Sequence, residues 1–260
     1  MFDFAGKTVV VTGGAMGIGY GIAERFAQAG TNTVIADINK EIGENKAEKI
    51  KEEYDAQSLF IKTDVSQEKD LVDLVQETVN KFGKIDVFVN NAGIFPSCPV
   101  LEMSLELFEK IQAVNLFGTF LGCREAAKVM VKNGGGNIIN IASIDALHPS
   151  MTGLAAYDAS KHGVWGFTKN FALEVAKQGI RVNAIAPGGV ATEGVEAMTG
   201  GAVKAGADQK DIMKEFTAKI PMGRFARPDE IATVALFLAS DASSYMTGEI
   251  IVVDGGVLLS

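Results

Sequence analysis

Short runs of β-branched and other apolar residues alternate with longer amphipathic stretches along the chain, and this alternation constrains the fold more than any other feature. The runs predict strands at residues 8–12, 33–37, 58–62, 86–90, 137–142, 181–186 and 250–253. Strand and helix in repetition indicate parallel strands joined by right-handed crossovers, with helices on both faces of the sheet. The sequence therefore predicts an α/β fold built on a doubly wound parallel β-sheet. The last strand is expected at a sheet edge, after a helix whose start is marked by Pro228.

The length and composition fit a single domain over residues 1–260. Hydrophobic residues make up 47% of the chain and charged residues 22%, which is typical of a compact globular protein. Between residues 189 and 222 the pattern weakens, because glycines interrupt short helical pieces. This segment follows the carboxyl end of a strand, where ligands bind in doubly wound sheets, so we expect a substrate lid there.

Charge and hydropathy exclude several classes of partner. The formal net charge of −8 opposes contact with phosphate backbones, so nucleic acid is not an expected partner. No apolar run approaches the roughly 18 residues that a membrane-spanning helix needs. Cys98 and Cys123 cannot form a disulfide framework, and the two histidines do not cluster with cysteines or paired acids. We therefore expect a cytoplasmic protein without a metal site and with a small-molecule substrate.

A glycine-rich turn lies between the first predicted strand and an amphipathic helix. Glycine lets the backbone approach a pyrophosphate closely, and the start of the helix offers unpaired N–H groups and the positive end of its dipole. Strand, turn and helix in this order indicate a Rossmann-type dinucleotide site. The turn residues expected at the cofactor are Gly13, Met16, Gly17, Ile18 and Gly19.

An acid, Asp37, ends the second predicted strand. Its carboxylate is placed to accept hydrogen bonds from an adenosine ribose and would repel a phosphate on that ribose. Met16 lies inside the glycine turn and Ile38 follows the acid, and neither offers a cation to such a phosphate. The sequence therefore predicts NAD as the cofactor, in preference to NADP.

Tyr157 and Lys161 are four residues apart, so a helix places the phenol and the ammonium on one face. A tyrosine titrates near about 10, but a neighbouring positive charge favours the phenolate and is expected to lower the pKa of Tyr157. Tyr157 would then exchange a proton with a substrate hydroxyl. Ser143 follows an apolar strand-like run and is placed to hold the same oxygen by a hydrogen bond.

In combination these motifs resemble the short-chain dehydrogenase/reductase family over essentially the whole chain. The glycine turn matches the family's TGxxxGxG pattern, and residues 90–93 read NNAG, the motif that follows its fourth strand. The resemblance implies a catalytic tetrad of Asn115, Ser143, Tyr157 and Lys161, in which Asn115 holds a water and Lys161 also binds the nicotinamide ribose. The cofactor contacts that the resemblance implies are Asp64, Val65, Asn91, Ala92, Gly93, Tyr157, Lys161, Pro187, Gly188, Val190 and Thr192.

The family resemblance implies an NAD-dependent oxidoreductase that transfers a hydride between NAD(H) and a secondary alcohol or its ketone. The loops expected around the substrate mix apolar and polar groups, which suits a polyol, a sugar or a small hydroxy compound. The residues expected to contact the substrate are Phe95, Ser143, Asp145, His148 and Tyr157.

Two alternative functions remain open. A 3-oxoacyl-[acyl-carrier-protein] reductase is the first, but Leu173 stands where such reductases commonly carry an arginine, and an acidic chain would repel an acidic carrier. A non-catalytic NAD-sensing protein is the second, since a fold does not fix a function, and the intact Tyr157 and Lys161 argue against it.

Two predicted helical segments, at residues 116–121 and 164–175, carry more apolar side chains than one core face requires. Members of the family pair such helices between subunits. The resemblance therefore implies a homo-oligomer, commonly a homotetramer.

Overall fold

The computed structural model describes residues 3–193 and 217–260. Most of the lid predicted at residues 189–222 lies outside the described residues. Of the predicted segment, only its two ends, at 189–193 and 217–222, can be placed.

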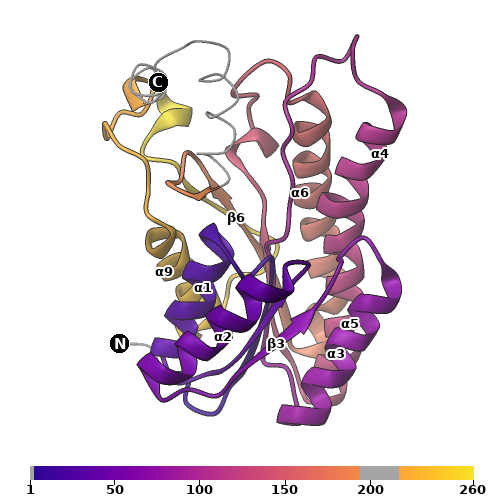
Figure 1. Cartoon of the computed structure of the whole chain (residues 1–260), viewed down its shortest axis with the longest axis vertical. Helices are drawn as coiled ribbons and strands as arrows, with labels where there is room; N and C mark the ends of the chain where they lie inside the picture. The colour runs from indigo at the N-terminus through magenta and orange to yellow at the C-terminus, as the bar shows by residue number, and fades with distance from the viewer. Residues whose placement is uncertain (1–2, 194–216) are drawn as a thin grey trace.

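Seven strands form one parallel sheet in the order β3, β2, β1, β4, β5, β6, β7 (Figure 1). Their bounds are β1 Thr8–Thr12, β2 Asn32–Asp37, β3 Ser58–Lys62, β4 Val87–Asn90, β5 Gly136–Ile141, β6 Ile180–Pro187 and β7 Ile250–Val253. All seven predicted strands are present within one or two residues of the predicted bounds, and β7 lies at the edge beside β6, as expected. The predicted doubly wound parallel sheet is therefore confirmed.

Seven α-helices of the described residues flank the sheet. Their bounds are α1 Gly17–Gln28, α2 Lys40–Tyr54, α3 Glu68–Phe82, α4 Leu105–Gln112, α5 Gly118–Lys132, α6 Ala155–Val175 and α9 Pro228–Ala239. Helices α1, α2 and α9 pack on one face and α3, α5 and α6 on the other, as Figure 1 shows. Within the described part of the chain, none of the helices is both long and apolar enough to cross a membrane.

The three central residues of β1 are all valine because both faces of the strand are covered. Val9 and Val11 belong to the core under α1 and α9, whereas Val10 belongs to the opposite core under α3 and α5. Successive side chains of a strand point to opposite faces, so a strand covered on both sides needs an unbroken apolar run. This burial on both faces is consistent with the position of β1 inside the sheet, between β2 and β4.

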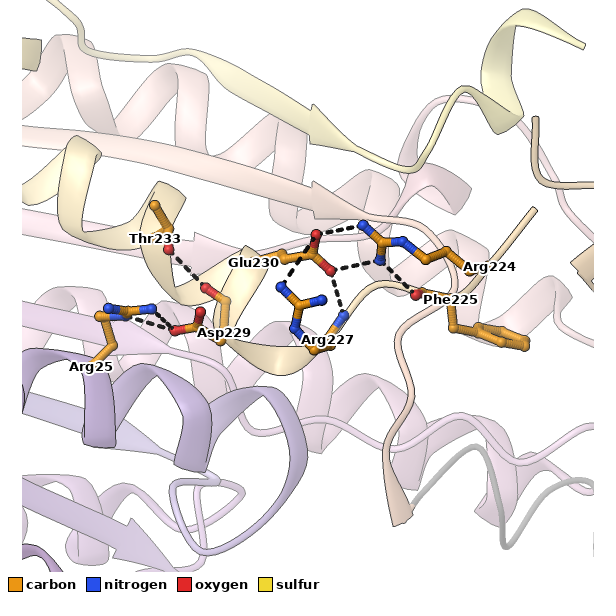
Figure 2. Close-up of polar contacts among 7 residues, drawn as sticks. All are labelled: Arg25, Arg224, Phe225, Arg227, Asp229, Glu230 and Thr233. Carbon is orange, nitrogen blue, oxygen red and sulfur yellow. Dashed lines mark hydrogen bonds and ion pairs between the residues drawn. The ribbon is translucent and has the colours of Figure 1, made fainter. Parts of the chain in front are cut away.

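The start of α9 is held by an arginine and carboxylate network (Figure 2). Arg224 donates from two guanidinium nitrogens to the two oxygens of Glu230, at 2.8 and 2.7 Å, and the backbone N–H of Arg227 also donates to Glu230. These donors lower the pKa of the Glu230 carboxyl to about 2. Arg25 of α1 donates from Nε to Asp229 at 2.6 Å, which ties α9 to the helix that follows the glycine turn.

Candidate active site

A cavity of about 1470 Å³ lies along the carboxyl ends of the strands. Its wall includes residues directly after β1, β2, β4, β5 and β6, among them Gly13, Ile38, Asn91, Ala142 and Gly188. The chain reverses its direction of winding between β1 and β4, and doubly wound sheets bind ligands at such a point. Except for Gly19 and Asn115, all the residues predicted to bind the cofactor, catalyse the reaction or contact the substrate line this cavity.

The glycine turn is clamped by the segment after β4. Gly13 has φ +61°, and a Cβ on it would lie 2.8 Å from the Cα of Ala92. The Asn91 side chain donates to the carbonyl oxygens of Thr12 and Gly13, and the Thr12 hydroxyl accepts from the backbone N–H groups of Asn91 and Ala92. These bonds hold the turn open to the cavity in a backbone shape that only glycine adopts without strain.

Gly19 lies behind the turn and has no room for a side chain. A Cβ there would overlap the carbonyl oxygen of Gly13 and the amide of Asn91. We expect Gly19→Ala to lower the free energy of unfolding by about 1–3 kcal/mol, because the backbone must shift. Gly166→Ala is the matched control, since a Cβ on this helical glycine meets nothing within 4 Å. It should be neutral or stabilising by up to about 1 kcal/mol, and equal losses in urea denaturation would contradict the prediction.

Asp37 lies at the end of β2 and is 9% exposed. Its carboxylate accepts from the backbone N–H of Ala15 at 3.1 Å and of Asn39 at 3.0 Å. These bonds fix the side chain at the cavity wall, and each oxygen retains a lone pair for a further donor. The neighbouring Ile38 side chain is 63% exposed and adds no positive charge.

The segment after β6 lines the cavity and reaches the glycine turn. Its backbone is anchored by the reciprocal bonds Ala226 N–H to Gly189 O and Ala191 N–H to Ala226 O, both 2.9 Å. Glu193 then accepts from the backbone N–H of Gly17 at 3.1 Å. Sequence reasoning missed this contact, because no local pattern predicts that a residue 176 positions away meets the turn.

The sequence also gave no signal for the carboxyl-terminal wall of the cavity. Val257 and Ser260 line it, together with Ile220 and Phe225. The tail is held by Asp254, which accepts from the backbone N–H groups of Gly256 and Leu258 at 2.8 Å.

Ser143, Tyr157 and Lys161 meet at the end of β5. Ser143 follows the strand, and α6 presents Tyr157 and Lys161 to it one turn apart. The Lys161 ammonium donates to the carbonyl oxygen of Ile141 at 2.7 Å and lies 5.7 Å from the centre of the Tyr157 ring. Phe95 packs edge-on against that ring, with 6.0 Å between the centres. Ser143 and Lys161 are buried, Tyr157 is half-buried, and Phe95 closes the cluster on one side.

Asn115 is fully buried in a π-helical turn, Ala113–Phe117, between α4 and α5. Its side chain accepts from the backbone N–H of Ile94 at 2.8 Å and donates to the carbonyl oxygen of Ile94 and to the hydroxyl of Ser160. Ser160 in turn donates to the backbone carbonyl oxygen of Tyr157. Asn115 therefore ties the loop that carries Phe95 to the helix that carries Tyr157.

The expectation that Lys161 lowers the pKa of Tyr157 is wrong for this structure. Burial raises the pKa of Tyr157 well above its ordinary value, the charges of Asp145 and Asp158 raise it further, and the nearby Ser143 hydroxyl opposes the rise. Burial also lowers the pKa of Lys161 to about 8. Desolvation disfavours the charged form of both groups, and this effect outweighs the favourable charge interaction expected from their spacing on the helix.

The burial of Lys161 predicts a pH-dependent stability. Between pH 8 and pH 10.5 the unfolded chain binds more protons at this residue than the folded protein does, so its contribution to the free energy of unfolding rises with pH. Relative to Lys161→Met, the wild type should gain on the order of 2 kcal/mol over this range. Urea denaturation at several pH values measures the difference, and a constant difference would contradict the prediction.

Asp145 and His148 follow Ser143 and both line the cavity, as expected of substrate contacts. Their environments differ, since Asp145 is buried and His148 is exposed. Asp145 lies in a short 3₁₀ turn, Ile144–Ala146, and accepts a hydrogen bond from the hydroxyl of Ser143 at 2.8 Å. The sequence identified the position but gave no sign of this bond.

Comparison with known proteins agrees with this geometry. The family model described as enoyl-(acyl carrier protein) reductase matches residues 13–258. A diacetyl reductase [(S)-acetoin forming] of Staphylococcus epidermidis is 40% identical over 97% of this chain and 98% of its own. The crystal structure of a short-chain type dehydrogenase/reductase from Mycobacterium marinum has a TM-score of 0.92 and 36% identity, covering 100% of this chain and 98% of that one.

A third similar protein carries a cofactor. It is a putative NAD(P) dependent gluconate 5-dehydrogenase from Beutenbergia cavernae, whose structure holds NADP at low occupancy. Its TM-score is 0.89 at 36% identity, and the match covers 100% of this chain and 99% of that one.

Proposed function

The chain belongs to the short-chain dehydrogenase/reductase family, an oxidoreductase family that uses a nicotinamide cofactor, and from this premise we propose the finer reaction. It interconverts a secondary alcohol and its ketone with NAD(H), and its substrate is a small neutral hydroxy compound, a polyol or a sugar. One observation carries the proposal. The same cavity has the Asp37 carboxylate in its wall, with the glycine turn, and the Ser143, Tyr157 and Lys161 cluster as well.

The residues present fit a nicotinamide dinucleotide. A Cβ on Gly13 would fill the space beside Ala92, and the glycine turn leads into the start of α1. The volume of the cavity exceeds what a small substrate alone requires. Gly13, Gly17, Ile18 and Asp37 would hold the adenosine and pyrophosphate half. Asn91, Gly93, Lys161, Gly188 and Thr192 would hold the other half. The bound nicotinamide supplies a carbon that gives or takes a hydride.

Tyr157 is the proton carrier in this proposal. Because burial keeps its phenol protonated, it is set to donate to a ketone oxygen during reduction. Ser143 orients that oxygen by a hydrogen bond, and Lys161, held by the Ile141 carbonyl, places a positive charge beside the phenol as negative charge develops. Asn115 acts through the Ile94 loop and Ser160, so it is a positioning residue.

The wall around Tyr157 favours a small substrate with polar groups. Phe95, Leu154 and Met151 are apolar, whereas Asp145 and His148 are polar. The Staphylococcus relative is named a diacetyl reductase that forms (S)-acetoin, and this supports a small reacting pair that includes a hydroxy ketone. An acyl-carrier substrate has less support, because Leu173 is 77% exposed where those reductases commonly place a docking arginine.

Initial rates with NAD and with NADP test the proposal, against a panel of secondary alcohols, polyols, aldoses and a 3-hydroxyacyl thioester. We expect NAD-dependent turnover of a small alcohol, polyol or sugar. Turnover confined to the thioester with NADP would replace this function by the acyl-carrier reductase. Cofactor binding without turnover of any compound would favour the NAD-sensing alternative.

We further propose that the protein is a homotetramer. Phe117 is 56% exposed and Phe120 is 40% exposed, and the ring of Phe120 packs against Phe167 of α6 on the same face. An exposed apolar face over two helices is typical of a subunit interface. Size-exclusion chromatography with light scattering is expected to give four times the 27.5 kDa chain mass. A monomer at micromolar concentration would refute this.

A further inference from the structure

Asp145 is a carboxylate buried beside the proposed proton carrier, and it is 6% exposed. Its Oδ2 accepts from the Ser143 hydroxyl at 2.8 Å, and its Oδ1 accepts from the backbone N–H of Ser150 at 2.9 Å. Its own backbone N–H donates to the Ser143 hydroxyl oxygen at 3.1 Å. Among the described residues, no cation forms an ion pair with this carboxylate. Its direct hydrogen-bond donors are therefore neutral, and the Lys161 ammonium attracts its charge from a greater distance.

The charge of Asp145 acts on the whole cluster. It raises the pKa of Tyr157 and of Asp158, and it opposes the fall in the pKa of Lys161 that burial causes. The Asp145 carboxylate is bonded directly to the serine that is proposed to hold the substrate oxygen.

The Ser143 hydroxyl has one proton, and that proton is already given to Asp145. A ketone oxygen that binds to Ser143 needs the same proton, so substrate binding takes a hydrogen bond away from Asp145. A buried carboxylate that loses a donor is unfavourable unless another donor replaces it. The substrate itself must supply this donor if binding is to be tight.

The geometry fixes where the replacement donor has to be. Ser143 Oγ and Asp145 Oδ2 are hydrogen-bond neighbours at 2.8 Å, so groups bound to the two must be adjacent on the substrate. A hydroxyl on the carbon next to the reacting carbon meets this requirement. A ketone or carboxylate in the same place offers only lone pairs or negative charge, and Asp145 would repel it.

We propose that Asp145 selects substrates with a hydroxyl next to the reacting carbon, namely α-hydroxy ketones for reduction and vicinal diols for oxidation. This rests on the proposed function. In reduction, the ketone carbon takes up a hydride from the reduced cofactor and its oxygen takes up the proton of Tyr157. The neighbouring hydroxyl keeps its own proton throughout and donates a hydrogen bond to Asp145.

The test compares butane-2,3-diol with 2-butanol, which has the same carbon chain and lacks the second hydroxyl. In the wild type, kcat/KM with NAD should favour the diol by about 100-fold or more, since a site that binds a hydroxyl rejects the analogue without it. Asp145→Ala should reduce this preference to less than about tenfold, mainly by a loss on the diol. In the reverse direction, Asp145→Asn should raise the rate for butane-2,3-dione relative to 3-hydroxybutan-2-one, because its amide can donate to the second carbonyl.

Asp158→Asn is the matched control. Asp158 also raises the pKa of Tyr157 through its charge, but no bond joins it to Ser143. It should leave the preference for the diol unchanged. Thermal unfolding and NAD affinity of each variant show that it folds and binds the cofactor.

Three results would overturn the inference. If the wild type oxidises 2-butanol with the same kcat/KM as the diol, the proposed selectivity is absent. Equal losses on both alcohols in Asp145→Ala would mean that Asp145 only supports the loop. If the wild type binds the cofactor but turns over no alcohol or ketone with NAD or NADP, the proposed function fails together with this inference. The first two results, in contrast, would leave the proposed function intact.

Discussion

Tyr157→Phe is expected to lower kcat by about a hundredfold to ten-thousandfold in both directions, because the variant lacks only the oxygen that carries the proton. The phenyl ring still fills its place against Phe95, so the loss should appear in kcat with little change in stability. Binding of NADH, followed by fluorescence, should remain within about threefold of the wild type, since catalysis and cofactor binding use different groups of this side chain.

Tyr245→Phe is the matched control for this substitution. Tyr245 is fully exposed and does not line the cavity, so its hydroxyl has no expected role in the reaction. The control should keep wild-type kcat. A Tyr157→Phe enzyme that retains more than about a tenth of the wild-type kcat would exclude Tyr157 as the proton carrier.

The second large effect concerns the choice of cofactor. We expect kcat/KM with NAD to exceed that with NADP by about 100-fold or more, because a 2′-phosphate would lie beside the Asp37 carboxylate. Like charges held this close are unfavourable by several kcal/mol, and about 1.4 kcal/mol corresponds to a factor of ten. The two backbone donors to Asp37 hold the carboxylate in place, so it cannot easily swing away.

The double variant Asp37→Ser, Ile38→Arg should lower this preference by about 100-fold or reverse it. The serine removes the repulsion, and the exposed position 38 allows a guanidinium to reach a phosphate. Ile38→Arg alone separates the two effects, since it adds attraction while the Asp37 charge remains. A wild type that uses NADP as well as NAD would refute the role assigned to Asp37.

The fold could be predicted because its information is local. Val9, Val10 and Val11 form an apolar run only because both faces of β1 are covered, and this run is visible without knowing which helix covers which face. Asp86 shows the limit at strand ends. It was expected in the fourth strand, but its carboxylate accepts from the backbone N–H of Thr8, and β4 begins one residue later.

The residues of the site could be predicted from the sequence, but their pKa values could not. The motifs brought Tyr157, Lys161 and Ser143 together, but the pKa of Tyr157 depends on the sum of burial and of charges from Asp145 and Asp158. These contributions depend on distances and burial in the folded protein, which the sequence does not give. The contact of Glu193 with the backbone of Gly17 could not be predicted for the same reason, since it joins residues 176 positions apart in the chain.

Hydride transfer itself is the central claim, and deuterium tests it most directly. Purified protein is mixed with NAD and secondary alcohols that are deuterated at the reacting carbon, including butane-2,3-diol, and the reduced cofactor is analysed by mass spectrometry. The account predicts one deuterium in each NADH formed and an equal amount of ketone. Protein that binds NAD but transfers no deuterium from any of these alcohols would contradict it.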